Sequence, residues 1–416
     1  MSVSTRTADQ PLTRNRDFVI VWAAGAVSEL GTSMSQLVFP LVGYAITHSV
    51  VEAGLATTGL IVGSVALRLP AGALVDRFAR SRVLIVTNAA AALVYASLAI
   101  ALLTRHLSLA HLVLAGFVSG VVDAFDAPAT SATVRTIVPT PQLPVAYTRL
   151  EAGERAARLI GPPVGGALYS LARGVPFLVD AVSYAATGLA VTRLRTPLPA
   201  PARRAQSMRA DVAEGLRFVW NHVGVRCMMI WGGLINFAGG FTFIAVTLRL
   251  IQRGTPPAAI GLVDTAAAIA GLVGALFAPM IIRRVPTGWL TIALTWTIAV
   301  LIVPQAWSTN VVAVGALLSL GTFLVPANNA GISAYMVSVV PDQLQGRVNS
   351  AAGFIAGGLA PLGPLLAGVA LAAVGGVATL LIGAVLTAAT ALPLLASRTI
   401  RGLGRPDEWA ATAAAN

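Results

Sequence analysis

The sequence predicts an all-α membrane protein with twelve transmembrane helices in two pseudo-symmetric six-helix halves. Three observations lead to this fold class: the composition, the apolar segments and an internal repeat. Of the 416 residues, 56% are hydrophobic and 11% are charged, and the mean hydropathy is +0.80. A soluble domain carries about 25% charged residues, so we expect most of this chain to lie in a lipid bilayer.

Twelve apolar segments are each long enough to cross a bilayer, for which about 20 residues suffice. The first six cover 18–45, 54–76, 83–104, 108–131, 151–172 and 176–194. The last six cover 225–249, 258–281, 288–306, 310–336, 350–372 and 374–397. Very short turns separate the last two segments of each half.

Polar segments divide the chain into two tails, two halves and a linker. The expected domains are a tail at 1–17, a half at 18–194, a linker at 195–224, a half at 225–397 and a tail at 398–416. The linker begins with a proline-rich stretch, which favours an extended chain. From Ser207 to Trp220, apolar residues gather on one face of a predicted helix, which is typical of an amphipathic helix on a membrane surface.

The arginines predict the orientation in the membrane. Of the 28 basic side chains, all arginine, 21 lie on the side of the two termini, 4 on the opposite side and 3 within spans. Basic residues favour cytoplasmic loops, so we expect both termini in the cytoplasm.

A shift of 202 residues superposes parts of the two halves without gaps. It places Gly72 on Gly274, Ser131-Ala132 on Ser333-Ala334, Val138-Pro139 on Val340-Pro341 and Gly161-Pro162 on Gly363-Pro364. One register held over about a hundred residues indicates two halves of the same polarity, a parallel repeat about an axis along the membrane normal. The copies differ at one charged loop, because Ala278 and Pro279 replace Asp76 and Arg77.

That charged loop follows the second apolar segment and carries Gly72, Asp76, Arg77, Arg80 and Arg82. Its spacing resembles the loop signature of the major facilitator superfamily. An ordinary charged turn is the alternative interpretation. The resemblance implies a gate at which Asp76 meets the start of the eleventh helix in one transport state.

A second motif lies in the predicted fifth helix and contains Arg158, Gly161, Pro162, Gly165 and Gly166. It resembles the antiporter motif of proton-driven exporters in the same superfamily, although Ala157 stands where that pattern has glycine. Glycine and proline here also suit a kinked helix that packs closely on its neighbours. The motifs together are most similar to the twelve-helix drug:proton antiporter branch, which includes macrolide, tetracycline and enterobactin exporters.

Polar side chains within the spans are costly and therefore mark candidate functional positions. Gly25, Glu29, Ser33 and Gln36 form a stripe on the first helix, and Asp123 and Asp126 lie on the fourth. Candidates in the second half are Asn236, Asn328, Asn329 and, as an outlier in the eighth helix, Asp264. The resemblance implies a cavity lined by helices 1, 4, 7 and 10. Hydrogen bonds between helices are the alternative role for the asparagines.

Glu29 is the leading candidate for carrying a proton. It lies eleven residues into the first helix, about 16–17 Å along the axis, which is close to mid-membrane. No basic residue shares that helix, so burial is expected to favour the protonated carboxyl. Asp123 and Asp126 are the other candidates. Glu29 could also bind a cationic group of the substrate.

The resemblance implies a secondary active transporter that exports a small hydrophobic or amphipathic compound by proton antiport and alternating access. A siderophore or metabolite exporter and a non-transporting sensor or scaffold are the alternatives. An enzyme is disfavoured, because no nucleophile or metal motif is present and Cys227 is the only cysteine. We expect no cofactor, metal or nucleic acid, and a monomer in a bacterial cell membrane whose partners are substrate, protons and lipid.

Overall fold

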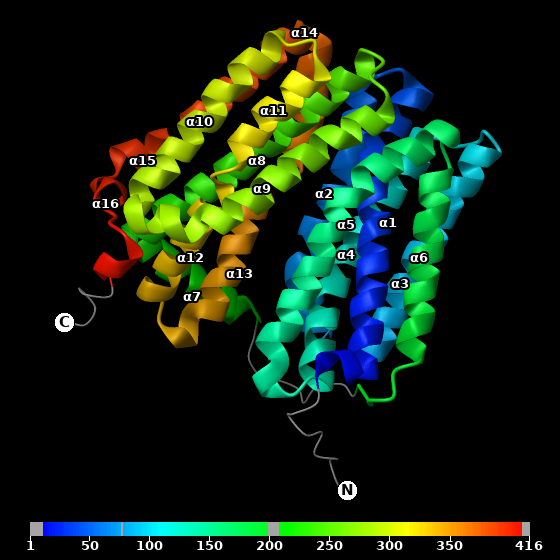
Figure 1. Cartoon of the computed structure of the whole chain (residues 1–416), viewed down its shortest axis with the longest axis horizontal. Helices are drawn as coiled ribbons and strands as arrows, with labels where there is room; N and C mark the ends of the chain where they lie inside the picture. Colours follow the sequence, from blue (N-terminus) through cyan, green and yellow to red (C-terminus); the bar gives the residue numbers. More distant parts are fainter. Residues whose placement is uncertain (1–10, 76–77, 199–207, 410–416) are drawn as a thin grey trace, which may run out of the picture. The chain divides into compact units, whose positions relative to one another are not determined.

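The computed structural model describes residues 11–75, 78–198 and 208–409, and all regular elements in these ranges are helices (Figure 1). This confirms the predicted all-α fold class. The chain forms two compact units. The first holds α1, α3 to α6 and most of α2, and the second holds α7, α8, α10 to α16 and most of α9.

Each of the six predicted spans of the first half corresponds to one helix. The helices are α1 (Arg16–Thr47), α2 (Val50–Val75), α3 (Arg80–Leu103), α4 (Leu109–Ile137), α5 (Leu143–Leu171) and α6 (Val175–Thr192). Helix α4 ends six residues later and α5 begins eight residues earlier than predicted. Side-chain caps define two of the starts. The Asn15 side chain accepts a hydrogen bond from the Phe18 amide and begins α1, and Ser108 caps α4 in the same way.

The second unit begins with the amphipathic helix and ends with two short helices. Its elements are α7 (Met208–Asn221), α8 (Val223–Gln252), α9 (Pro257–Arg284), α10 (Thr287–Trp307), α11 (Val311–Thr322), α12 (Val325–Val339), α13 (Asp342–Gly358), α14 (Leu362–Ala389), α15 (Leu392–Ala396) and α16 (Arg398–Arg401).

Two predicted spans of the second half are not continuous helices. The span 310–336 is interrupted between α11 and α12. Pro326 lies in the first turn of α12, where its lack of a backbone N–H is tolerated but prevents a continuous helix. The span 350–372 is interrupted at residues 359–361, between the end of α13 and the start of α14. The short turn expected near 373 lies within α14, at Gly375, where φ is 76° and the helical hydrogen-bonding pattern is interrupted.

Ten helical segments in the described part of the chain are long and apolar enough to cross a membrane. One of them, Ala351–Ala396, has 46 residues and contains the Gly375 break, so it accounts for two predicted spans. The predicted span 151–172 belongs to α5, whose N-terminal half carries Glu151, Glu154, Arg155 and Arg158 and is too charged to be counted. The protein is therefore a multi-pass membrane protein.

Small residues bring the helices of the first unit close together. A Cβ atom at Gly161 of α5 would lie 2.6 Å from the Ser33 Cβ atom of α1, and one at Gly165 would lie 2.9 Å from the Met34 Cα atom. These approaches fix α5 against α1 over the turns that carry the polar residues.

In the second unit, α7 and the C-terminal segment pack on the helical bundle. Gly215 of α7 lies against the Arg347 carbonyl of α13, and Glu214 forms an ion pair with the Arg347 side chain. Ile400 and Leu403 belong to the same buried cluster as Trp231. Leu216 and Trp220 of α7 remain exposed.

Candidate functional site

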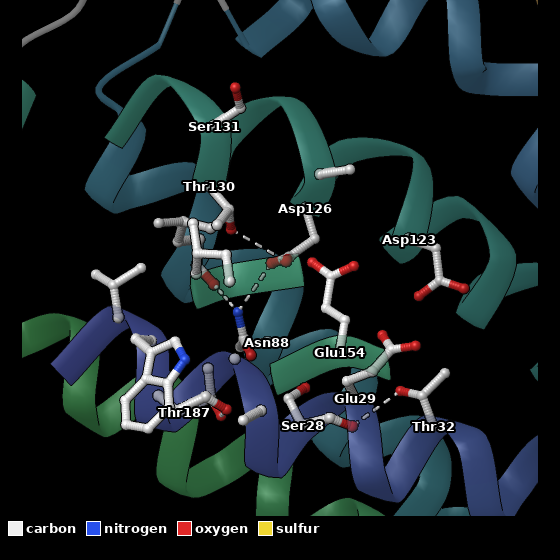
Figure 2. Close-up of a pocket in the computed structure, with 18 of the residues that line it drawn as sticks. Ser28, Glu29, Thr32, Asn88, Asp123, Asp126, Thr130, Ser131, Glu154 and Thr187 are labelled. Atoms are coloured by element: carbon white, nitrogen blue, oxygen red, sulfur yellow. Dashed lines mark hydrogen bonds between the residues drawn. The ribbon is translucent and has the colours of Figure 1, made fainter. Parts of the chain in front are cut away.

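The first unit contains a cavity of about 530 Å³, lined by α1, α3, α4, α5 and α6. Its ionisable lining residues are Glu29, Asp123, Asp126, Glu151, Glu154 and Arg158. The carboxyl groups of Glu29, Asp126 and Glu154 gather around a common space (Figure 2). Asp123 also lines the cavity, so the three predicted proton-coupling candidates, Glu29, Asp123 and Asp126, lie in one cavity.

Glu29 has an ion-pair partner that its own helix did not reveal. The Arg158 Nε atom of α5 lies 2.7 Å from the Glu29 Oε1 atom, and Arg158 Nη2 lies 3.7 Å from Glu154 Oε2. The absence of a basic residue from the predicted first helix predicts a buried Glu29 carboxyl without a cationic partner. That prediction is wrong, because the close packing of α1 and α5 brings Arg158 to it.

Asp126 is held by two neutral hydrogen-bond donors. Asn88 Nδ2 of α3 lies 3.3 Å from Asp126 Oδ1, and Thr130 Oγ1 lies 3.3 Å from Asp126 Oδ2 (Figure 2). The Asn88 amide also donates to the Leu84 carbonyl at 2.8 Å, which fixes its position on α3. Sequence reasoning missed Asn88, although a lone asparagine in an apolar span was a usable signal.

Asp123 lies one turn earlier on α4 and faces the same cavity (Figure 2). It makes no hydrogen bond or ion pair with any of the described residues. The cavity thus contains an acid paired with arginine, an acid bonded to neutral donors and an acid without a partner.

The polar stripe predicted on α1 is divided between two surroundings. Gly25, Glu29 and Gln36 line the cavity. Ser33 is buried instead at the contact with α5, against Gly161, and does not line it. A stripe of this length spreads across a helix face, so one edge faces α5 and the other the cavity.

The antiporter-like motif of α5 combines packing with charge. Gly161, Pro162, Gly165 and Gly166 are all buried. Arg158 precedes them by one turn and reaches the cavity. The motif therefore holds α5 close to α1 and places a cation beside Glu29.

The loop motif is described only in part. Asp76 and Arg77 lie outside the described residues. Gly72 lies in the last turns of α2, and Arg82 is exposed in the first turn of α3. The Arg80 side chain donates to the Ala132 carbonyl at 3.2 Å and also bonds to Thr136, so it ties α3 to the end of α4.

The second unit contains a separate cavity of about 560 Å³, lined by α8, α10, α11, α12, α13 and α14. Asn236, Asn328 and Asn329 line it together with apolar and small residues, and no charged residue of the described part of the chain lines it. Asp264 of α9 is not part of this lining. The sequence places Asp264 in the eighth predicted span but does not show which way its side chain faces.

The Major Facilitator Superfamily profile matches residues 21–364, and the chain belongs to this family. The protein is a transporter of small molecules in a membrane, not an enzyme. The multidrug efflux pump Tap of Mycolicibacterium fortuitum is 24% identical over 370 residues, which cover 86% of this chain and 89% of that pump. The pump of the same name in Mycobacterium tuberculosis (strain ATCC 25618 / H37Rv) is 26% identical over 289 residues, covering 66% of this chain and 67% of the pump.

Solved transporter structures share the fold. The nucleoside transporter NupG has a TM-score of 0.72 at 11% identity, covering 91% of this chain and 99% of NupG. A bacterial homologue of the iron transporter ferroportin has a TM-score of 0.68 at 15% identity, covering 93% of this chain and 100% of the homologue. At these identities the likeness establishes the fold alone.

Proposed function

We propose that this transporter exports small hydrophobic or amphipathic compounds in exchange for protons, by alternating access. The observation that carries the proposal is the ion pair between Glu29 and Arg158 inside a cavity with further acids. Its relatives are multidrug efflux pumps, which supports export as the direction and lipophilic drugs as the substrate class.

Proton binding at Glu29 is the coupling step. A proton on this carboxyl removes its charge, so Arg158 loses its 2.7 Å ion pair and is free to strengthen its contact with Glu154, now 3.7 Å away. Release of the proton restores the first pair. Two alternative partners for one cation provide the two states that a coupled transporter needs. Asp123 and Asp126 are the other acids able to take part.

Substrate contact falls to the uncharged cavity of the second unit. Its apolar lining favours lipophilic compounds, because burial of apolar surface supplies most of their affinity. Asn236, Asn328 and Asn329 are proposed to orient the bound molecule.

Proton coupling is tested in proteoliposomes that hold the purified protein. A panel of lipophilic compounds is followed with an imposed proton gradient and again after an ionophore has collapsed it. We expect accumulation against a concentration gradient only while the proton gradient persists. Equal uphill transport in both conditions would exclude proton antiport.

The proposed orientation places both termini in the cytoplasm of the cell. Replacing Cys227 gives a background for single reporters, since it is the only cysteine. A cysteine at Ser308, which follows α10, is expected to react with a membrane-impermeant reagent in whole cells. A cysteine at Ser81, in the first turn of α3, is expected to stay unlabelled, and the reverse pattern would invert the topology.

A further inference from the structure

The amphipathic helix α7 divides its apolar residues between the protein interior and the exterior. Val219 is fully buried and belongs to the same cluster as Trp231 of α8 and Val348 of α13. Leu216 and Trp220 are four residues apart and so lie on one face of the helix, where they are exposed by 39% and 57%. Only part of the apolar face predicted from the sequence therefore packs against the protein.

Contacts with α13 fix this orientation of α7. The two helices lie side by side (Figure 1). The Arg347 carbonyl occupies the place that a Cβ atom at Gly215 would take, and Glu214 forms an ion pair with the Arg347 side chain. These contacts hold the face with Gly215 and Val219 against the bundle, so the face with Trp220 points away from it.

The same ion pair leaves the outer side of α7 positively charged. The acidic and arginine side chains of 213–227 are Glu214, Arg217 and Arg226. Arg347 neutralises Glu214. Arg217 is exposed, and neither Arg217 nor Arg226 forms an ion pair with any of the described residues. Two arginines thus remain without a carboxylate partner in this part of the structure.

These two arginines flank the exposed tryptophan. Arg217 precedes Trp220 by three residues, a spacing that places Cβ atoms about 5–6 Å apart on a helix. The Arg226 Nη1 atom donates to the Trp220 carbonyl at 2.8 Å, so it satisfies one of the carbonyls that the last turn of a helix leaves without a partner. Arg217, Trp220 and Arg226 form one cationic surface at the end of α7.

The course of the chain places this cationic surface beside the membrane. Only His222 separates the end of α7 at Asn221 from the start of α8 at Val223. Helix α8 is long and apolar enough to cross a membrane. Trp220 and Arg226 therefore lie within about one turn of the point where the chain enters the bilayer. Tryptophan is enriched at this depth, and arginine extends its charge to the lipid head groups there.

We propose that the cationic surface binds an anionic phospholipid, with the phosphate between Arg217 and Arg226 and the acyl chains along Leu216 and Trp220. Two unpaired arginines favour an anionic head group over a zwitterionic one, because the amine of a zwitterionic lipid would add a further cation. The exposed apolar side chains favour a lipid over a soluble anion, since a lipid covers them with its acyl chains. The site is independent of the substrate and of the coupling ion.

Lipid binding is measured by native mass spectrometry of the full-length protein in detergent micelles. Palmitoyl-oleoyl phosphatidylglycerol or palmitoyl-oleoyl phosphatidylcholine is added, and each bound molecule is resolved by its mass. Phosphatidylglycerol is expected to bind about tenfold more tightly than phosphatidylcholine, because two arginines attract it. Equal affinity for the two lipids would overturn the proposal.

Charge variants test the two arginines separately. Arg217→Gln and Arg226→Gln are each expected to weaken phosphatidylglycerol binding about fivefold and to leave phosphatidylcholine binding unchanged. Arg217→Lys keeps the charge and is expected to retain most of the affinity. Arg173→Gln is the matched control, because Arg173 is an exposed arginine in the turn between α5 and α6. Affinities in both test variants equal to that of the control would overturn the proposal.

The apolar part of the surface is tested at the tryptophan. Trp220→Ala is expected to weaken phosphatidylglycerol binding about two- to tenfold, whereas Trp220→Phe keeps an apolar ring and is expected to retain it. Trp307→Ala is the control, because Trp307 at the end of α10 is exposed by 59%, as much as Trp220. Equal affinity in Trp220→Ala and Trp307→Ala would show that acyl chains do not lie on Trp220 and would overturn the proposed binding mode.

Soluble competitors distinguish a lipid from other anions. Glycerophosphoglycerol has the same head group without acyl chains, and a polyglutamate peptide represents an acidic protein segment. Neither is expected to displace bound phosphatidylglycerol. Displacement by the first would assign the surface to a soluble phosphodiester, displacement by the second would assign it to an acidic protein, and either result would overturn the proposal.

Discussion

The two cavities are nearly equal in volume, about 530 and 560 Å³, but opposite in chemistry. Among the described residues, five acids and one arginine line the first, whereas no charged residue lines the second. The 202-residue repeat relates them position by position: Asp123 corresponds to Val325, Asp126 to Asn328, Glu151 to Gly353, Glu154 to Ala356 and Arg158 to Ala360. The two copies have therefore kept a common scaffold and diverged in charge.

The pair Asp126 and Asn328 shows this divergence most clearly. The two residues lie on corresponding helices, and each accepts a hydrogen bond from a neighbouring helix. Asp126 accepts from Asn88 of α3, and Asn328 accepts from Thr291 of α10. The carboxylate can take up a proton, while the amide can only exchange hydrogen bonds. One half thus suits proton movement and the other suits contact with a neutral molecule.

The largest expected effect comes from neutralising the first cavity at its ion pair. Glu29→Gln is expected to abolish accumulation of substrate against a gradient, because the side chain no longer changes charge, while downhill equilibration continues. Uphill and downhill flux in proteoliposomes measure the two activities.

Glu151→Gln is the matched control for that variant. Glu151 pairs with Arg155 at 2.6 Å on the same helix face, and both side chains are more than half exposed. Exposed pairs contribute little, so this variant is expected to keep uphill transport. Proton-dependent uphill transport at a normal rate in Glu29→Gln would remove Glu29 from the mechanism.

Making the second cavity resemble the first is expected to have the next largest effect. Asn328→Asp keeps the oxygen bonded to Thr291 but replaces the amide donor with an acid. An uncompensated acid in a membrane interior costs about 2.5–3.5 kcal/mol. Binding of the uncharged lipophilic dye Nile red is therefore expected to weaken, and binding of a lipophilic cation, tetraphenylphosphonium, is expected to strengthen. If the ratio of the two affinities is the same in Asn328→Asp as in the unsubstituted protein, the asparagine does not select the ligand.

Filling each cavity separately is expected to divide the two activities. Gly25 lines the first cavity and Gly239 the second, and an added Cβ atom meets no atom within 4 Å at either position. Gly25→Phe is expected to reduce proton-driven flux while Nile red still binds, whereas Gly239→Phe is expected to abolish Nile red binding. Equal losses of proton-driven flux and of dye binding in the two variants would contradict separate roles for the two cavities.

The smallest expected effect concerns the support of Asp126. Asn88→Leu introduces the residue found at the corresponding position, Leu290, and removes one hydrogen bond from Asp126. The loss of one such bond is worth about 0.5–1.5 kcal/mol, so we expect a two- to tenfold lower rate of proton-driven efflux. If Asn88→Leu has the same initial efflux rates as the unsubstituted protein over a range of pH, Asn88 only packs α3 against α4.

The sequence alone determined the helical class, the internal repeat and the family that the motifs suggested. These properties follow from local hydrophobic length and from residue order, which need no knowledge of neighbouring helices. It also placed Glu29, Asp123 and Asp126 at positions that line one cavity, because acids in apolar helices have few tolerable surroundings.

Only the tertiary structure decided which residues meet. Arg158 and Glu29 are 129 residues apart, and the glycines of α5 bring them within 2.7 Å. Helical periodicity could not tell that Ser33 faces α5 while Gln36 faces the cavity. It could not reveal either that Thr291 of α10 donates a hydrogen bond to Asn328 of α12, because a hydrogen bond depends on the partner that packing supplies, and that partner lies elsewhere in the chain.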